Sequence, residues 1–246
     1  MKKILLLIAI ALPFVFNSCK DDKDEPLTPD NHECVDLGLP SGTLWATCNV
    51  GADSPEEYGD YFAWGETDPK EIYDWTNYNW GHWKWDTISD HFYHVEVTLY
   101  KYYFRNWTND AYVKGDGKTE LDTEDDAAYV NWGSKWRTPT LKQMQELVDC
   151  CSWKWTQQNG VKGHLVTGPN KKTIFLPAAG GRSDKLYNDG VHAYYWTRNL
   201  CDPDKLELEA AEQEQAYILS SRSFEWHVWY QTRYNGGTVR AVRAKK

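Results

Sequence analysis

The chain has 246 residues, a formal net charge of −9 and an aromatic content of 15%, with 14 Trp and 16 Tyr but only 2 Met and 7 Phe. A surface of this charge is repelled by phosphate backbones, which argues against nucleic acid as a partner. The length suits one large domain or one domain with elaborated loops, and the many rings supply broad apolar faces for a core or for binding.

Residues 1–18 have the three parts of a secretory signal: two lysines, an apolar run over residues 4–16, and a small residue before Cys19. The apolar run is shorter than the roughly 20 residues that cross a bilayer as a helix. The position of Cys19 resembles a bacterial lipobox, in which this cysteine is acylated, for example with palmitate. The acidic run behind it resembles the signal that places lipoproteins on the outside of Bacteroidota-type cells. We therefore expect a surface-exposed lipoprotein of the cell outer membrane, attached through its lipid alone.

The segment 19–32 is charged and contains proline, which predicts a flexible tether between the lipid and a single domain over residues 33–246. The domain should begin with strands at residues 34–37 and 43–50. A Pro-Ser-Gly turn separates these two segments, and the second one alternates between two faces, as a strand does.

Five cysteines remain besides Cys19, and an odd count leaves at least one thiol free or paired between chains. Cys34 and Cys48 flank the first hairpin and could face each other across it. Cys150 and Cys151 are neighbours at the expected end of a helix and would need different partners. No Cys-x-x-Cys spacing is present, so the case for a zinc site is weak.

Residues 56–118 lack clear apolar periodicity and are dense in aromatic residues, which predicts a long irregular lobe with a short strand at residues 95–99. Loops of this length inside a domain are usually functional. The candidates for exposed stacking platforms are Trp75, Trp80, Trp83 and Trp85. The alternative is that these rings fill a small core of the lobe itself. Trp83 and Trp85 are two residues apart, so on a strand they would share one face.

Two helices are expected after the lobe. Thr123 and Asp126 predict a capped helix over residues 124–131, and Thr140 with Gln143 forms a capping box for a longer second helix. The apolar stripe expected on the second helix consists of Leu141, Met144, Leu147, Val148 and Cys151.

An acidic cluster precedes the first of these helices. Oxygen ligands of this kind can hold Ca²⁺, so Asp122, Asp125 and Asp126, with Glu124 beside them, are weak candidates for a metal site. The simpler explanation is that the acids stabilise a helix N-terminus, and no other cofactor is expected.

The C-terminal part of the chain reads as strands interrupted by an acidic insertion at residues 206–214. Asn159-Gly160 marks a turn. The expected strands are residues 165–167, 173–176, 194–197, 216–220, 226–231 and 238–242, and the first two flank Gly168-Pro169-Asn170-Lys171 as a hairpin. Strands, then two helices, then strands is the order typical of an α+β fold rather than of an alternating parallel one.

Several longer strings carry a resemblance to a known family. They are VDLGLPSGTLWATCNVGA at 35–52, YGDYFAWGET at 58–67, DDAA at 125–128, WGSKWRTPT at 132–140, IFLPAAG at 174–180, YWT at 195–197 and VRAVR at 239–243. Together they resemble the Fibrobacter succinogenes major paralogous domain, found in many secreted and lipid-anchored Bacteroidota proteins. The resemblance runs from about residue 34 to the C-terminus.

That family is similar to the C-type-lectin-like fold shared with formylglycine-generating enzymes. The resemblance implies a twisted antiparallel sheet, two flanking helices and a loop lobe that is the usual ligand face. In that fold the Trp-Arg-x-Pro-Thr segment opens the second helix, and the last strand carries Val-Arg-x-Val-Arg.

The residues of these strings have structural roles in our interpretation. Thr140 caps the second helix and Trp136 can wedge beneath it. Arg137 could pair with Asp125, Asp126 or a row of carbonyls. Arg240 and Arg243 are at odd spacing, so on a strand they face opposite sides, one buried in an ion pair and the other solvated.

The sequence favours a noncatalytic, lipid-anchored cell-surface module for binding or adhesion, with a glycan or a protein as ligand. The alternative is a structural subunit of a surface assembly. An oxidase of the formylglycine-generating type is disfavoured, because no cysteine follows Cys201 to complete the C-terminal pair. A hydrolase is disfavoured because no carboxylate pair stands out and no nucleophile elbow accompanies His164, His192 or His227. The sugar motifs of calcium-dependent lectins, Glu-Pro-Asn and Gln-Pro-Asp, are absent from the sequence.

Overall fold

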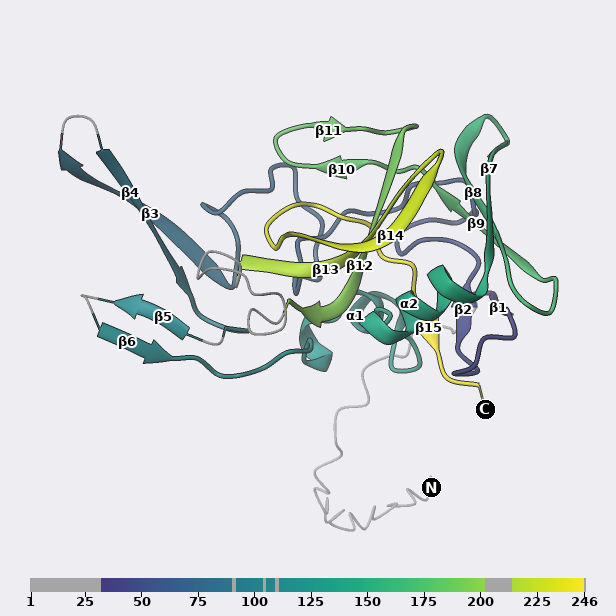
Figure 1. The fold of residues 1–246 in the computed structure, drawn as a ribbon, viewed down its shortest axis with the longest axis horizontal. Helices are drawn as coiled ribbons and strands as arrows, with labels where there is room; N and C mark the ends of the chain where they lie inside the picture. The colour runs from purple at the N-terminus through teal and green to yellow at the C-terminus, as the bar shows by residue number, and fades with distance from the viewer. Residues whose placement is uncertain (1–31, 90–91, 104, 109–110, 202–213, 246) are drawn as a thin grey trace, which may run out of the picture.

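A computed structural model describes residues 32–89, 92–103, 105–108, 111–201 and 214–245, which form an α+β fold made mostly of antiparallel strands (Figure 1). The helices in these ranges are a 3-10 turn, Thr123–Asp125, and α1 Ala127–Trp132 and α2 Leu141–Cys150. The strands are β1 Cys34–Asp36, β2 Leu44–Ala46, β3 Gly81–Ser89, β4 Phe92–Leu99, β5 Arg105–Thr108, β6 Ala111–Lys114, β7 Ser152–Gln158, β8 Val161–Thr167, β9 Thr173–Pro177, β10 Gly181–Arg182, β11 Leu186–Tyr187, β12 His192–Leu200, β13 Gln215–Arg222, β14 Glu225–Thr232 and β15 Val242–Arg243.

The strands form several small sheets. The three-stranded ones have the orders β1-β2-β15, β7-β8-β9 and β12-β13-β14, and the remaining strands pair as the hairpins β3–β4, β5–β6 and β10–β11. All these strand pairs are antiparallel. The expected order of strands, helices and strands is therefore confirmed, and with it the α+β class.

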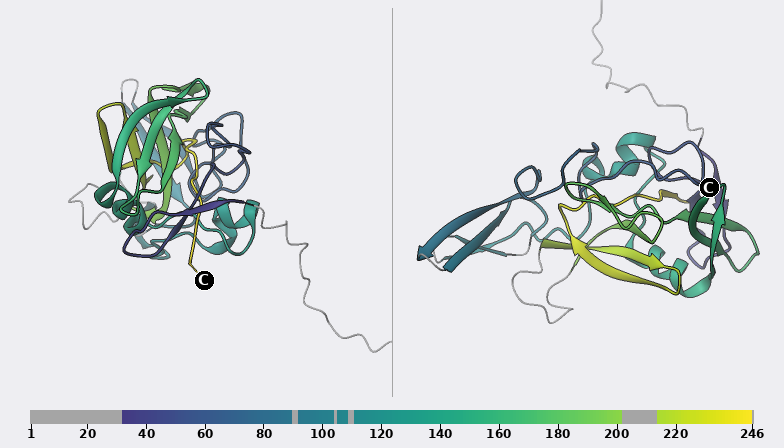
Figure 2. Two further views of the ribbon diagram at one scale, coloured as in Figure 1. Left: turned by 90° about the vertical axis from the view of Figure 1, so that its right-hand side faces the viewer. Right: turned by 90° about the horizontal axis from the view of Figure 1, so that it is seen from above.

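The lobe is more regular than expected. In place of one short strand at residues 95–99 it contains β3–β4 and β5–β6, which extend together from one end of the body (Figures 1 and 2). In β3–β4, Trp83 lies opposite Val97 and Trp85 opposite Val95. The period of two in β3 is weak in the sequence because charged and histidine residues surround its two tryptophans. Trp83 and Trp85 do lie on one strand, at positions that share a face.

The second helix begins as expected. The Thr140 side chain accepts from the Gln143 backbone N–H, and the Thr140 backbone N–H donates to Gln143 Oε1, which completes the capping box. Met144 and Leu147 of the expected stripe are fully buried. The first helix begins later than expected, because its N-cap is Asp126, whose carboxylate accepts from the N–H groups of Ala128 and Tyr129.

The C-terminal segment was expected to be a strand over residues 238–242, but only Val242 and Arg243 pair as one, with β2. The residues before them form individual backbone hydrogen bonds to β12 on one side and to β2 and the segment after it on the other. The N–H of Val50 donates to Val239 O at 3.0 Å, and that of Trp196 donates to Thr238 O at 3.0 Å. Residues 239–241 are nonetheless buried, so this segment joins the first sheet to the central one.

The strand that follows α2, β7, was not among the strands expected from the sequence. β7 pairs with β8 through a turn at Asn159 and Gly160, both with positive φ, as a tight hairpin turn requires and as the Asn-Gly pair predicts. The β8–β9 hairpin was expected and is confirmed.

The cysteine expected to face another across the first hairpin forms no disulfide with it. Cys34 lies opposite Ala46, and its thiol and those of Cys48, Cys150 and Cys151 are free.

Two arginines near the C-terminus differ in their surroundings. Arg240 is fully buried, and no described residue forms an ion pair with it: its guanidinium donates to Asn49 Oδ1 at 2.8 Å and to backbone oxygens of Ala46 and Thr47. The expected ion pair is thus replaced by neutral acceptors, and burial lowers the pKa of Arg240. Arg243 lies 5.1 Å over the ring of Trp136.

The segment that leads into α2 is fixed by ring contacts. Trp136 is fully buried, as expected, and Trp132 packs edge-on against it. His32 stacks on Trp132 with ring centres 3.7 Å apart. Arg137 donates to the carbonyls of Ser134 and Trp136. Of the partners expected for Arg137, the structure therefore shows backbone carbonyls.

The core has three parts. One apolar cluster contains Trp64, Trp136 and Trp196, and a second contains Trp45, Met144 and Leu147 under α2. A third cluster lies where the lobe meets the body; its buried members are Tyr61, Ala63, Tyr73, Trp75, Tyr78, Leu99 and Ala179.

Candidate functional site

The lobe tryptophans were expected as exposed platforms, and two of them are not. Trp75 is 7% exposed and packs edge-on against Tyr78 and Tyr234 at 5.4 and 5.1 Å. Trp80 is partly buried, and its Nε1 donates to Gly65 O at 2.6 Å. Trp75 and Trp80 instead pack in the apolar cluster of the lobe, which is the alternative to an exposed platform. The side chains of Trp83 and Trp85 lie outside the described part.

The acidic cluster surrounds a lysine. The ammonium of Lys101 lies 2.7 Å from Asp122, 2.5 Å from Asp125 and 3.8 Å from Glu124. It also lies about 5 Å from the ring centres of Trp80 and Tyr102, which adds cation–π attraction. Burial acts to lower the pKa of Lys101, but the interactions with Asp122, Asp125 and Tyr102 outweigh it and raise that pKa.

Asp126 faces away from this lysine, because its carboxylate accepts from Thr138 and from the first N–H groups of α1. Asp122, Asp125 and Asp126 therefore do not converge on one point. Among the residues that the structure describes, no group of three or more His, Cys, Asp or Glu side chains could hold a metal ion.

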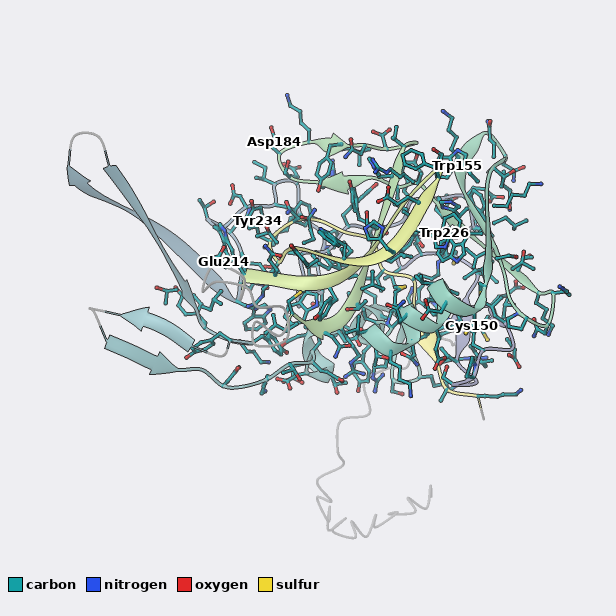
Figure 3. All side chains as sticks on the ribbon, viewed as in Figure 1. Cys150, Trp155, Asp184, Glu214, Trp226 and Tyr234 are labelled. Carbon is teal, nitrogen blue, oxygen red and sulfur yellow. The ribbon has the colours of Figure 1, made fainter. Side chains whose placement is uncertain are left out.

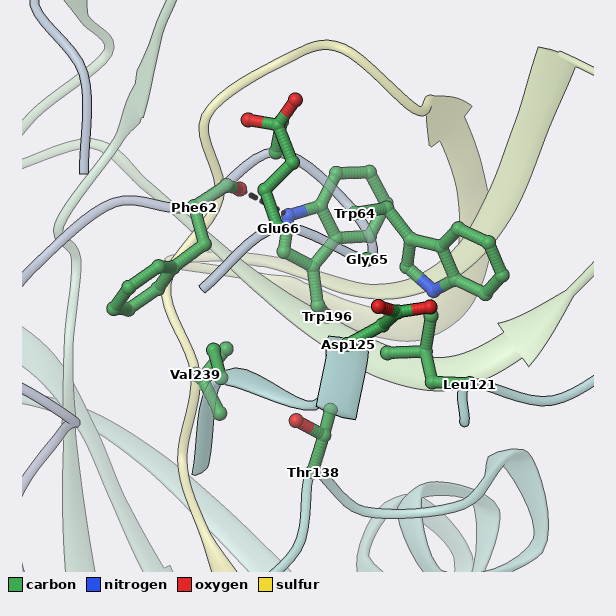
Figure 4. Close-up of a pocket in the computed structure, with 11 residues that line it drawn as sticks. Phe62, Trp64, Gly65, Glu66, Leu121, Asp125, Thr138, Trp196 and Val239 are labelled. Carbon is green, nitrogen blue, oxygen red and sulfur yellow. Dashed lines mark hydrogen bonds between the residues drawn. The ribbon is translucent and has the colours of Figure 1, made fainter. Parts of the chain in front are cut away.

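A small internal cavity lies between the lobe and the body (Figure 4). Its volume is about 10 Å³, and its walls include Trp64, Glu66, Asp125 and Trp196. The Trp196 Nε1 donates to Phe62 O at 2.8 Å beside it. A space of this size holds one water molecule at most, so it is a packing defect rather than a ligand site.

A much larger groove, of about 750 Å³, lies where the first turns of α2 meet the sheet β12-β13-β14. Its lining residues are Glu120, Thr140, Leu141, Lys142, Gln145, Asn199, Tyr217 and Val228. The volume falls in the range of ligand-binding clefts.

The sheet register explains why the groove opens here. Leu219 lies opposite Val228, and Tyr217 lies opposite Tyr230, so these four residues share one face of the sheet. α2 packs on β14 and β12 and covers Leu219, which is fully buried. Tyr217 and Tyr230 are only partly buried. The groove is therefore the part of this sheet face that α2 leaves uncovered.

The polar wall of the groove is fixed by hydrogen bonds. Asn199 Oδ1 accepts from the N–H of Leu141 at 2.7 Å, and Asn199 Nδ2 donates to Glu120 Oε1 at 3.2 Å. Arg198 lies 3.4 Å from the other oxygen of Glu120. On α2, Gln145 Nε2 donates to Asp149 at 2.9 Å. Amide and carboxylate groups are thus held in set directions around the groove.

Exposed rings gather on the β13–β14 hairpin beside the groove. Trp229 is 52% exposed and stacks on Tyr230, with ring centres 4.7 Å apart and planes 16° apart. Phe224, at the turn of the hairpin, is 71% exposed and lies under the guanidinium of Arg222. The sequence interpretation placed a strand here but did not single out its rings. The available signal was the Trp-His-Val-Trp-Tyr run at residues 226–230, inside the strand expected at 226–231.

A buried histidine packs against this hairpin near its turn. His164 is fully buried, neither ring nitrogen has a hydrogen-bond partner among the described residues, and three tryptophans pack edge-on around it. They are Trp153, Trp155 and Trp226, with ring centres 4.9 to 5.6 Å from that of His164; Figure 3 labels two of them. Burial lowers the pKa of His164 to about 4.

Because His164 is buried in its neutral form, we expect the free energy of unfolding to fall as the pH is lowered. Between pH 6.5 and pH 4 the unfolded chain binds a proton at His164 that the folded chain excludes, which costs about 3 kcal/mol in total. The raised pKa of Glu214, about 7, acts in the opposite direction below pH 7. We therefore expect His164→Phe to gain about 3 kcal/mol relative to the parent between pH 7 and pH 4. Urea unfolding of both proteins at a series of pH values measures this, and parallel pH profiles would contradict it.

Comparisons with known proteins add no assignment. No family model matches the chain, no curated protein matches its sequence, and no solved structure matches its fold. No helix in the described ranges is long and apolar enough to cross a membrane.

Proposed function

We propose that this protein is a noncatalytic binding or adhesion module, held on the outer surface of the cell by an acyl chain on Cys19. The N-terminal pattern of lysines, short apolar run and cysteine supports the anchor. The ligand is a glycan or a protein outside the cell, and the membrane is contacted through lipid alone. We further propose that the α+β fold is of the C-type-lectin-like kind and that the chain is similar to the Fibrobacter succinogenes major paralogous domain. The order of its elements and the quoted sequence strings support this proposal.

The observation that carries the proposal is the groove beside α2, bordered by exposed rings. Rings that are exposed on a folded surface cost free energy in water and gain it on contact with a partner. Trp229 and Phe224 lie on the same hairpin as the groove residues Tyr217 and Val228. By strand alternation Trp229 projects from the opposite sheet face to Val228, and it is linked to the groove side through Tyr230, on which it stacks. The groove and these exposed rings therefore belong to one hairpin at the edge of the sheet.

The chemistry of the groove supports binding rather than catalysis. Among its described lining residues Glu120 is the single carboxylate, and it is already shared by Asn199 and Arg198. Glycoside cleavage by the common mechanisms needs two carboxyl groups on either side of the scissile bond. Hydrolysis through a serine or cysteine needs a nucleophile with a base, and no serine or cysteine is found in the described part of the lining.

Two measurements test the proposal on the full-length chain produced in a lipoprotein-processing bacterial host. Labelling with a palmitate analogue and protease treatment of intact cells should show an acylated, accessible protein, and Cys19→Ala should abolish the label. A protein that is unlabelled and confined to the cytosol would contradict the anchor.

The binding half of the proposal is tested with the detergent-solubilised full-length lipoprotein on arrays of glycans and of extracellular proteins. Trp229→Ala should weaken the binding of any ligand found by about tenfold, because one exposed, stacked ring is lost. Tyr100→Ala is the matched control, since Tyr100 is 56% exposed but lies on the lobe. Absence of binding on both arrays would count against a binding module.

A further inference from the structure

We propose that the groove beside α2 binds a neutral oligosaccharide, with Tyr217 as the ring on which a sugar stacks. This inference rests on the proposed function and assigns its ligand class and its contact residues. It departs from the expectation that the aromatic lobe is the ligand face, because Trp75 and Trp80 of that lobe are occupied in packing.

The mixed composition of the groove is the first argument. A sugar ring presents hydroxyl groups around its edge and C–H groups on its faces, so it needs polar groups at the side and an apolar surface beneath. In the groove, Tyr217 and Val228 come from the sheet below, and the polar residues Lys142 and Gln145 come from the helix above. The electron-rich face of a tyrosine attracts polarised C–H groups. An extended apolar peptide would leave these polar groups unpaired.

The hydrogen-bonding capacity of the groove is the second argument. Sugar hydroxyls both donate and accept. Glu120 and Asn199 each use some of their capacity within the wall, and each carboxylate oxygen and amide group can take a further partner. Lys142 and Gln145 are exposed on the first turns of α2 and add donors and an acceptor. Because the wall groups are fixed by Leu141 and by one another, little conformational entropy is lost when a ligand binds.

The balance of charge argues for a neutral sugar rather than an acidic one. The chain has a net charge of −9, and Glu120 places a carboxylate in the groove itself. Lys142 is the one cationic residue among the lining residues that the structure describes, and Glu146 and Asp149 lie on the same helix. A uronic acid or a sulfated sugar would meet this field unfavourably, whereas a neutral hydroxyl would not.

A line of rings extends the site beyond the groove. Tyr217 lies directly opposite Tyr230, and Tyr230 stacks on Trp229 at 4.7 Å. β14 is the edge strand of its sheet, so this line runs from the groove around the edge to an exposed surface. Such an arrangement suits a chain of several sugars better than a single one.

The test measures binding of the detergent-solubilised full-length lipoprotein to short neutral oligosaccharides (cello-, xylo-, manno- and laminari-series), with heparin fragments as the acidic probe. We expect at least one neutral series to bind and heparin not to bind. Tyr217→Ala should weaken the binding about tenfold, and Tyr217→Phe, which keeps the ring, should stay within about threefold of the parent. Gln145→Ala, a change on an exposed helix position that leaves the fold intact, should weaken it by about threefold or more. Tyr100→Ala is again the control for an exposed ring elsewhere.

The outcomes separate this inference from the proposed function. Binding to enzymatically deglycosylated proteins, with no neutral sugar bound, would overturn the glycan assignment and leave a binding module. Sugar binding that Tyr217→Ala and Gln145→Ala both leave unchanged would overturn the groove as its site. Binding of heparin in preference to neutral sugars would overturn the charge argument. Failure to bind any sugar or protein would count against the proposed function itself.

Discussion

Replacing Arg233 by methionine is expected to lower the free energy of unfolding by about 3 kcal/mol, because three buried acceptors lose a charged donor together. Arg233 is fully buried, and its guanidinium donates to Tyr78 Oη at 2.9 Å, to Tyr102 O at 2.8 Å and to Lys101 O at 3.0 Å. It also lies 5.0 Å over the ring of Trp64. One side chain thus joins the end of β14 to two loops of the lobe.

The variant Arg233→Lys sharpens this prediction. Lysine keeps the charge but cannot donate in three fixed directions, and its compact ammonium is harder to desolvate, so a loss similar to that of Arg233→Met is expected. Chemical denaturation measures both losses. The exposed Lys245 gives the matched control, since Lys245→Met removes a surface cation and should cost within about 0.5 kcal/mol. Two variants at position 233 as stable as the parent would contradict the assigned role.

Replacing Asp126 by alanine is expected to cost about 3 kcal/mol, the second large effect. The carboxylate is fully buried and accepts from the Ala128 N–H at 3.0 Å, from the Thr138 N–H at 3.0 Å and from the Thr138 hydroxyl at 2.7 Å. Loss of an N-cap alone costs about 1 kcal/mol, and the orphaned donors of Thr138 add the rest.

Two further changes separate capping from charge at this position. Asp126→Asn keeps one accepting oxygen and should lose roughly half as much free energy, because bonds to a charged acceptor are about twice as strong. Glu124→Ala removes an acid of the same cluster that is largely exposed, and its unfolding midpoint in urea should be unchanged. If Asp126→Ala were as stable as Glu124→Ala, the buried cap would not be what holds the start of α1.

The sequence predicts the parts of this molecule that depend on near neighbours. The capping box of Thr140 and Gln143 and the Asn159–Gly160 turn are both set by residues within a few positions of each other, and both are confirmed. The start of α1 was misplaced because Thr123 and Asp126 are both good caps, and the choice depends on Thr138, which lies elsewhere in the sequence.

The candidate site could not be predicted in the same way. The groove is made by Glu120, the first turns of α2, Asn199, Tyr217 and Val228, which meet only when the sheet and the helix pack together. Arg233 gives no local signal either, since its partners Tyr78 and Tyr102 are more than a hundred residues away. For the lobe, aromatic density predicted an exposed binding surface, but at Trp75 the same rings supply the apolar area that a lobe poor in aliphatic residues needs for its own core.

The path of the last residues has a consequence for how the protein is made. Ala46 donates its N–H to Ala241 O, and β15 pairs with β2, so the final residues complete a sheet whose other strands are synthesised first. Contacts between such distant parts of a chain form slowly and late. The first sheet is therefore completed only after Ala241, Val242 and Arg243 have been synthesised, long after its first two strands.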